Sequence, residues 1–372
     1  MGWWFGRKAA EPAPPLVPLW LQGEGELGGF VRGYQAQLDE TYAKNPVGLR
    51  AVRLVAGLVG VLPVFTAEGD AKAVELVRNG GLLERAAAAL LLHGNAYVRL
   101  VTDSRDRPAE LCLLRPERVS IACGADGWPS AYLYRAGGQV TRVAKEDALG
   151  RRQVAHLKAL NPGDDHYGLG CLEAACAGAT VHNRASRWNK ALLDNAARPS
   201  GALIYEPGDG SSLSGEQFDR LKAELGEQFS GSANAGRPLV LDGGLKWQAL
   251  GLSPADMDFV AVKEAAARDI ALAFGVPPVL VGLPGDATYA NAREAGRALY
   301  RQTILPMAET MLRELGAMLG DWLGPVAIEI DQDKISELAE DRAMLWRQVN
   351  SADFLSREEK RKQLGFEPEG GQ

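Results

Sequence analysis

Hydrophobic positions repeat at helical spacing early in the chain and then give way to short alternating runs. An apolar helix is predicted over residues 47–61, and Pro63 ends it. A second helix is predicted over 81–92, with a stop at His93-Gly94-Asn95. Short alternating runs separated by turn residues follow at 96–101, 111–114, 118–122, 131–134 and 139–143. This pattern predicts an antiparallel meander, so the first 165 residues are expected to be α+β.

Two long helices are predicted farther along the chain. The first covers 172–195, contains no proline and would be about 36 Å long at 1.5 Å per residue. The second begins at Ser253, where Pro254 and Asp256 form a helix start signal, and it ends at Gly275. Its apolar stripe consists of Phe259, Val262, Ala266, Ile270 and Phe274. Because both helices flank one small insert, an elongated subunit is expected.

The insert between these helices, residues 200–253, has the pattern of a small α/β module. A strand is predicted at 202–205, and Ser214 with Gln217 forms a capping box for the helix that follows. Two further strands are predicted at 238–241 and 245–250. The apolar stripe of the insert helix, which we expect to pack inside the module, is Phe218, Leu221, Leu225 and Phe229.

The remaining segments are shorter or less regular. Residues 1–45 are proline- and glycine-rich and are predicted to form an irregular arm. A Gly/Pro loop at 279–288 precedes a helical stretch at 290–319 that Pro306 should kink or break. A strand at 326–330 and a polar helical tail at 336–364 are predicted to close the chain.

Composition and charge exclude several classes of protein. The chain has 372 residues, and 41 Lys and Arg against 47 Asp and Glu give a net charge of −6, so nothing global drives tight DNA binding by counterion release. Four cysteines in a chain of this length are typical of a reducing compartment. Residues 1–8 lack the apolar core of a signal peptide, and the most apolar window, 54–65, is too short to span a bilayer. We therefore expect no membrane role.

Motifs for catalysis are largely missing from the sequence. It contains no P-loop, no nucleophile elbow and no H-E-x-x-H. A G-x-G-x-x-G at 23–28 is acidic and follows no strand pattern, so we interpret it as a linker. Cys171 and Cys176 fit no zinc spacing and are expected to be small core residues. One set of candidate metal ligands, which would make the chain a metal-dependent hydrolase, remains as an alternative to a polar turn: His156, Asp164, Asp165 and His166.

Several short sequences occur in a fixed order along the chain, and together they are similar to one family. They are 154–158 with Tyr167-Gly168-Leu169-Gly170, 194–203, 231–238 with 241–244, 270–278, and 289–291 with 303–306. Over residues 165–315 the sequence thereby resembles the siphovirus-type portal proteins of tailed bacteriophages, and 353–366 resembles the family's C-terminal segment. Cys171-Leu172 departs from a Ser-Pro-Leu type step that is common in the family.

The resemblance implies a structural protein with no catalytic residues, metal or cofactor. It implies a homo-oligomeric ring, dodecameric in particles, at one capsid vertex of a virion or phage-like particle assembled in the bacterial cytoplasm. Its implied partners are the major capsid protein, the terminase large subunit, the head–tail adaptor and double-stranded DNA without sequence specificity. An Ala- and Arg-rich composition favours a prophage or a gene transfer agent. A helical scaffold without a channel is a further alternative.

The parts of this family map onto the predicted elements. The expected order is an N-terminal arm (1–45), a wing (46–170), a stem helix (171–199), a clip (200–253), a second stem helix (254–275), a tunnel loop (276–289), the rest of the wing (290–335) and a crown-like segment (336–372). In the tunnel loop, Leu283, Pro284, Gly285, Asp286, Ala287 and Thr288 would line the narrowest part of the channel, and this segment carries no Lys or Arg. Trp247 is expected to contribute to the clip or to a subunit contact. The stem residues of interest are Arg184, Arg187, Lys190, Phe259, Lys263 and Arg268.

Overall fold

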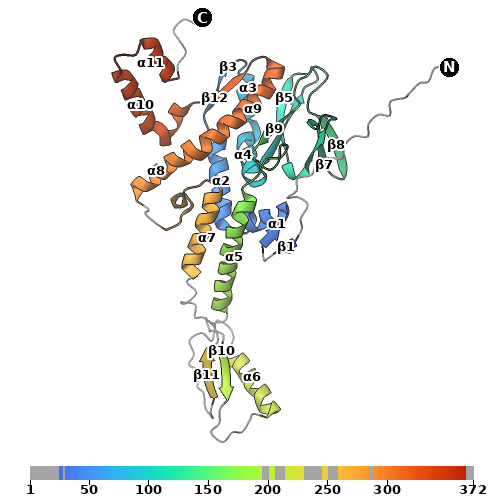
Figure 1. Cartoon of the computed structure of the whole chain (residues 1–372), viewed down its shortest axis with the longest axis vertical. Coiled ribbons are helices and arrows are strands. Elements are labelled where there is room, and N and C mark those ends of the chain that lie inside the picture. Colours follow the sequence, from blue (N-terminus) through green and yellow to red (C-terminus); the bar gives the residue numbers. More distant parts are fainter. Residues whose placement is uncertain are drawn as a thin grey trace, which may run out of the picture.

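A computed structural model shows an elongated subunit with a broad head, a two-helix stem and a small module at the far end (Figure 1). The structure describes residues 25–27, 30–194, 201–205, 214–229, 245–249, 259–284 and 288–365. In the part of the chain so described, no helix is long and apolar enough to cross a membrane.

The head, which contains the residues that we expected to form a wing and is called the wing below, is built around two amphipathic helices, α2 (Pro46–Gly60) and α4 (Leu82–His93). Asn45 caps α2 by accepting hydrogen bonds from the backbone N–H groups of Val47 and Gly48, both at 3.0 Å. The buried faces of the two helices pack together within the main hydrophobic core. Both helices confirm the sequence prediction to within about one residue at each end.

Six strands follow α4, but they form two sheets where the sequence predicted one meander. The first sheet has the order β5-β4-β9 and the second has the order β6-β7-β8, all antiparallel. A 3₁₀ turn at Pro116–Arg118 separates the sheets, and β9 returns to pair with β4. The strands are β4 (Asn95–Thr102), β5 (Pro108–Leu114), β6 (Val119–Cys123), β7 (Pro129–Ala136), β8 (Gln139–Ala144) and β9 (Val154–Lys158).

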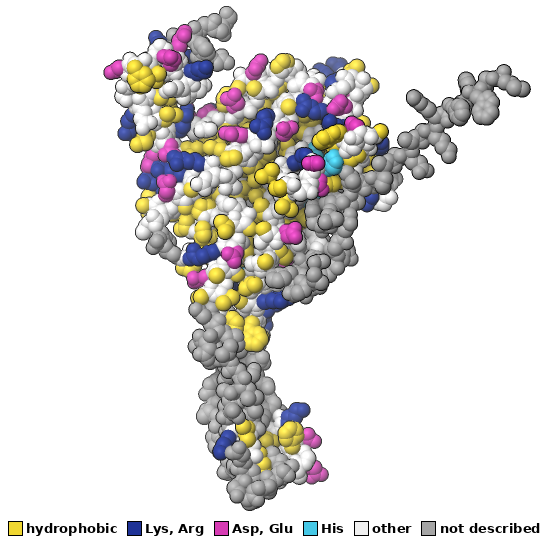
Figure 2. Space-filling model, in the orientation of Figure 1, with side chains coloured by type: hydrophobic (Ala, Val, Ile, Leu, Met, Phe, Trp, Pro, Cys, Tyr) yellow, Lys and Arg dark blue, Asp and Glu magenta, His cyan; other side chains and the backbone are white. Residues whose placement is uncertain are grey.

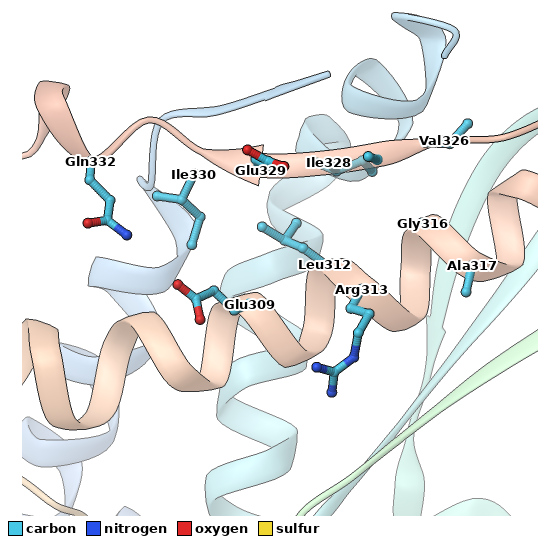
Figure 3. A pocket seen from close by; sticks show the side chains of 11 residues that line it. Glu309, Leu312, Arg313, Gly316, Ala317, Val326, Ile328, Glu329, Ile330 and Gln332 are labelled. Atoms are coloured by element: carbon cyan, nitrogen blue, oxygen red, sulfur yellow. The ribbon is translucent and has the colours of Figure 1, made fainter. Parts of the chain in front are cut away.

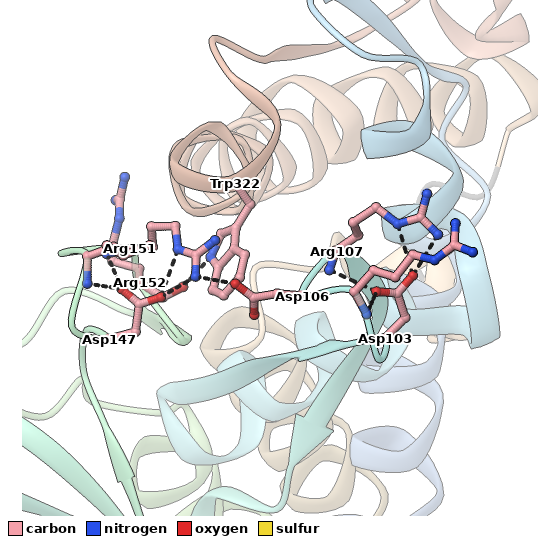
Figure 4. Close-up of polar contacts among 9 residues, drawn as sticks. Asp103, Asp106, Arg107, Asp147, Arg151, Arg152 and Trp322 are labelled. Carbon is pink, nitrogen blue, oxygen red and sulfur yellow. Dashed lines mark hydrogen bonds and ion pairs between the residues drawn. The ribbon is translucent and has the colours of Figure 1, made fainter.

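The second sheet shares a small hydrophobic core with Tyr97, Leu114 and Val154 of the first sheet, and ion pairs and an aromatic contact hold the segment that follows β8 (Figure 4). In the segment that joins β8 to β9, Arg151 contacts Asp106 at 2.6 Å, and its guanidinium lies 3.7 Å from the ring centroid of Trp322. Arg152 contacts Asp321 at 2.6 Å, and its carbonyl accepts a hydrogen bond from Trp322 Nε1 at 2.8 Å. Trp322 and Asp321 both belong to α9 (Leu305–Leu323), so this helix holds the segment between β8 and β9 in place.

Two elements between α2 and α4 are absent from the sequence prediction. They are β3 (Val64–Glu68) and α3 (Lys72–Arg78). β3 pairs with β12 (Ala327–Ile330), which lies near the other end of the chain. α3 spans about two turns, which is too short for a helical period to be recognised.

The prediction of an irregular arm over residues 1–45 is wrong for its last part. α1 (Tyr34–Leu38) continues into a π-helical turn at Asp39–Ala43, and β1 (Gly25–Leu27) pairs with β2 (Phe30–Arg32). Tyr34, Glu40 and Thr41 are buried. A Cβ added to Gly48 of α2 would lie 1.9 Å from the Thr41 carbonyl oxygen, so only glycine allows the π-helical turn to lie this close to α2. Residues 1–24 lie outside the described residues.

The stem consists of α5 (Leu172–Asp194) and α7 (Phe259–Ala273), which lie side by side (Figure 1). Gly178 of α5 permits this packing, because a Cβ there would lie 3.0 Å from the Ala266 carbonyl oxygen of α7. The predicted start signal at Ser253, Pro254 and Asp256 lies outside the described residues. Val262 was expected in the apolar stripe, but its side chain is exposed on the isolated subunit.

The module beyond the stem contains β10 (Gly201–Tyr205), α6 (Gly215–Phe229) and β11 (Leu245–Ala249), with β10 and β11 antiparallel. The predicted capping box is confirmed: Ser214 Oγ accepts from the Gln217 N–H at 3.3 Å, and Gln217 Oε1 accepts from the Ser214 N–H at 2.9 Å. Phe218, which we expected inside the module, is 57% exposed, so that prediction is wrong for this residue. Trp247 pairs with Leu203 in the ladder.

Leu221 is half-buried, whereas the side chains of Leu225, Phe229 and Trp247 and the predicted strand at 238–241 lie outside the described residues.

The C-terminal third contains one almost continuous helical run and a small tail. α8 (Tyr289–Leu299) continues through a π-helical turn at Tyr300–Ile304 into α9, so the irregularity predicted at Pro306 precedes the proline, which occupies the first turn of α9. The tail forms α10 (Ala339–Ser351) and α11 (Arg357–Gln363).

Candidate functional site

The loop between α7 and α8 is fixed to the wing at both of its ends. On the α7 side, Gly275 has φ +65°, and its carbonyl accepts a hydrogen bond from Thr303 Oγ1 at 2.9 Å. A 3₁₀ turn follows at Pro278–Val281. On the α8 side, Thr288 caps the helix by accepting from the Asn291 N–H at 3.2 Å.

The loop residues named from the sequence therefore divide into three groups. Leu283 is half-buried, and its side chain packs against the main hydrophobic core, which anchors the loop. Pro284 is exposed, and Thr288 is a helix cap. Gly285, Asp286 and Ala287 lie outside the described residues.

The loop sequence does not show that a residue of the stem helix contacts the loop. Arg268, which belongs to the stem helix α7, donates a hydrogen bond from Nη2 to the Pro284 carbonyl oxygen at 2.6 Å. The loop segment carries no Lys or Arg, but a guanidinium reaches it from outside. Arg268 also lines a groove with Leu272, which is 77% exposed, and with Thr303. The loop, the stem helix α7 and the π-helical turn at Tyr300–Ile304 therefore meet at this groove.

The basic residues predicted for the stem lie on α5 and α7. Arg184, Arg187 and Lys190 are exposed on α5, and Arg187 contacts Glu40 at 3.4 Å. Lys263 of α7 is half-buried.

Near the far end of the described stem, the ring of Phe259 lies 6.2 Å from that of Trp188. Both Trp188 and Val260 are substantially exposed, and Figure 2 shows apolar surface in this part of the stem. A single copy therefore leaves apolar stem side chains in contact with water.

A buried polar cluster attaches the stem to the wing. Asn45 Nδ2 donates to Asn183 Oδ1 at 2.9 Å and lies 3.3 Å from His182 Nδ1. Asn183 Nδ2 donates to the Glu40 carbonyl at 2.9 Å. Burial, with the nearby Lys263 ammonium, lowers the pKa of His182, so the neutral form is favoured. Asn183 of α5 thus joins this helix to the cap of α2 and to the π-helical turn at Asp39–Ala43.

A second buried cluster fixes the turn that leads into α5. Asn95 Oδ1 accepts from the Gly168 N–H at 2.8 Å and from His156 Nε2 at 2.9 Å, and Asn95 Nδ2 donates to the Gly168 carbonyl at 2.9 Å. His156 also stacks on Tyr97, with ring centroids 4.3 Å apart. This strand histidine and the glycine turn together formed the first of the motifs on which the family resemblance depended, and the structure gives them a shared structural role.

The metal-dependent hydrolase alternative has no support. Asp164 Oδ1 accepts from the backbone N–H groups of His166 and Tyr167, which is a polar turn, and the Asp165 carbonyl accepts from Lys158 Nζ. His156 is engaged by Asn95 and Tyr97. Among the described residues, no group of three or more His, Cys, Asp or Glu could hold a metal ion.

The buried histidines predict how stability depends on pH. Burial lowers the pKa of His93 to about 3, and burial together with Lys158 lowers the pKa of His156 to about 3. The unfolded chain takes up protons near pH 6.5 and the folded chain does not, so each histidine should destabilise the fold by about 1.4 kcal/mol per pH unit below about pH 6. Urea unfolding at pH 7.5, 6.5 and 5.5 measures this effect. His156→Gln should reduce the slope, and an unchanged midpoint from pH 7.5 to 5.5 would contradict the assignment.

Comparisons with known proteins identify the family. The chain matches the family model "Phage portal protein" over residues 46–365. It is 38% identical over 349 residues to an uncharacterised protein of Rickettsia felis, which covers 88% of each chain. A chain in the solved virion of a native gene transfer agent particle is 41% identical, with 96% of this chain and 97% of that chain covered and a TM-score of 0.71.

A chain in the neck of a native gene transfer agent particle, solved with C12 symmetry, is 44% identical, with 90% of this chain and 94% of that chain covered and a TM-score of 0.69. The fold, the glycine turn that leads into α5 and these matches all indicate the same family. The chain belongs to the phage portal protein family and is a portal protein.

Proposed function

We propose that this chain assembles into a ring of twelve copies at one vertex of a phage-like particle and that double-stranded DNA passes through the axis of the ring. The observation that carries this proposal is the similarity to the neck chain solved with C12 symmetry, at 44% identity and over 90% of this chain. The particle type that the similarity favours is a gene transfer agent or a related prophage particle.

The parts of the subunit take the following roles in this proposal. The wing is formed by 46–170 and 290–335, the stem by 171–199 and 254–275, the clip by 200–253, the tunnel loop by 276–289 and the crown by 336–372, with 1–45 as an N-terminal region. The clip, which lies at the far end of the stem in Figure 1, docks the terminase large subunit during packaging and the head–tail adaptor afterwards. The wing meets the major capsid protein. The exposed Phe218 of α6 supports a contact surface on the clip.

The electrostatics of the loop region fit a channel that holds DNA weakly. Strong neutralisation of phosphates would make movement along the duplex slow. Arg268 uses Nη2 to hold the Pro284 carbonyl, and Arg293 of α8 is paired with Glu340 at 2.7 Å. These two cations near the loop therefore have protein partners that compete with phosphate.

Electron microscopy of the purified chain tests the proposal. Class averages should show rings with a central hole wide enough for a duplex, with the stem helices nearest the axis. Particles that lack a hole, or a stem that faces away from the symmetry axis, would contradict the proposal.

Charge placed on the apolar end of the stem should prevent ring closure. Val260 is 69% exposed on the single subunit, and in a ring we expect a neighbouring copy to cover it. Val260→Glu would leave a carboxylate unpaired in that contact, which typically costs several kcal/mol. Sedimentation velocity should show loss of rings for Val260→Glu. The matched control is Leu160→Glu in the wing, where the leucine is 86% exposed, and rings should be retained. Equal ring formation by both variants would show that Val260 does not lie in the contact between copies.

A further inference from the structure

A groove runs along the unpaired edge of β12, between this strand and α9 (Figure 3). Five consecutive residues, Val326 to Ile330, line it. Successive side chains of a strand point to opposite faces, so five consecutive residues can line one groove only when it follows the backbone edge. β12 pairs with β3 on one side, and no described strand pairs with it on the other.

The chemistry of the groove suits an extended apolar segment with a basic end. Its volume is about 590 Å³. Leu312, Gly316 and Ile328 are buried and form apolar walls. Three exposed charged residues also line the groove, the two carboxylates of Glu309 and Glu329 and the guanidinium of Arg313, so its net charge is negative. Exposed strand edges are usually covered, because their free N–H and C=O groups recruit other strands.

Residues 3–9 of this chain have the matching sequence. Trp3, Trp4 and Phe5 are consecutive aromatic residues, so a strand would place Trp3 and Phe5 on one face and Trp4 on the other, and Arg7 and Lys8 follow. This stretch contains no proline, whereas the next segment has prolines at 12, 14, 15 and 18 that cannot join a ladder. Aromatic side chains would enter the apolar part of the groove, and the two cations would meet the carboxylates of Glu309 and Glu329.

The connecting segment is long enough to reach the groove from within the same copy. Residues 10–24 form the connecting segment, which can span at most about 50 Å when fully extended. This length is roughly the diameter of a compact domain of 250 residues. A tethered segment also has a millimolar effective concentration at such a site, which favours its own copy over another.

We propose that residues 3–9 add as a strand to the free edge of β12 in the same copy and so cover the groove beside α9. This arrangement is a strand addition in which main-chain hydrogen bonds supply affinity and the aromatic and basic side chains supply specificity. It links the N-terminal segment to the strand that closes the wing.

Hydrogen exchange of the full chain tests the proposal directly. The amides of 327–330 should exchange about tenfold faster in a chain that lacks residues 1–11, while the amides of β7, which contributes no residue to the groove, should not change. Equal exchange at 327–330 in the two chains would overturn the proposal.

A peptide assay with matched variants tests the site and the source of the segment. A labelled peptide of residues 1–11 should bind the truncated chain, as measured by fluorescence anisotropy. Glu309→Lys should weaken this binding about tenfold, which is 1.4 kcal/mol. Glu314→Lys, also exposed on α9 but outside the groove, should not weaken it. Equal effects of the two variants would overturn the groove as the site.

A mixture of copies tests whether the segment stays within its own copy. The truncated chain is combined with the full-length Glu309→Lys chain, which carries the segment but a weakened groove. Amides 327–330 of the truncated chain should remain unprotected. Their protection in the mixture would show that the segment comes from another copy and would overturn the same-copy assignment.

Discussion

Replacing residues 284–287 with a Gly-Ser linker of equal length is expected to leave rings intact and to abolish the retention of packaged DNA. The structure sets the limits of this replacement. Leu283 packs against the core and Thr288 caps α8, so both must remain if the wing is to keep its stability. The replaced residues are those that the proposal places at the narrowest part of the channel.

The measurement is nuclease-protected DNA per particle, together with ring formation by microscopy. DNA content should fall to the level of particles without a portal, whereas ring number and diameter should be unchanged. Arg268→Lys serves as a second variant, because a lysine cannot reproduce the guanidinium geometry at the Pro284 carbonyl but keeps the charge. It should reduce retention less than the replacement does. Normal packaging by the linker variant would show that residues 284–287 do not act on DNA in the channel.

Gly94→Ala is expected to be among the most destabilising single substitutions in the wing. Gly94 ends α4 with φ +80°, and a Cβ there would lie 2.4 Å from the Gly170 backbone nitrogen and 2.6 Å from the Gly168 carbonyl carbon. The turn that leads into α5 passes directly over this residue. Left-handed strain and a backbone clash together should cost more than about 3 kcal/mol of unfolding free energy.

The matched control lies at the other end of the same helix. Gly81 also has a left-handed conformation, with φ +63°, but a Cβ there meets nothing within 4 Å. Gly81→Ala should therefore cost only about 1 kcal/mol. Urea unfolding of both variants measures the difference. Equal destabilisation would show that strain alone matters and that the contact with the stem turn does not.

Elements whose stabilising contacts are local were predictable from the sequence. The apolar repeats of α2 and α4 encode their buried faces, the proline-free run of 172–195 allowed α5, and the Ser214–Gln217 capping box uses residues only three apart. The ordered set of short motifs identified the family, and two of its glycines, Gly168 and Gly170, are required because backbones nearly touch there. The loop between α7 and α8 was also predictable, since Gly and Pro mark its start.

Elements that depend on distant partners were not predictable. β3 pairs with β12 from the far end of the chain, and the meander divides into two sheets because β9 returns to β4. The π-helical turn at 39–43 depends on its close packing against Gly48. Arg268 reaches Pro284 only because α7 and the loop fold back on each other.

By itself, the sequence determined the long helices, the position of the insert and the membership of a family, because each of these depends on side-chain spacing within a few turns or on local backbone requirements. The tertiary structure alone decided which strands pair, how the turn at Gly168 sets the start of the stem, and which cation reaches the loop. These features depend on contacts between residues far apart in the chain, whose free energy is realised only after the intervening segments have folded.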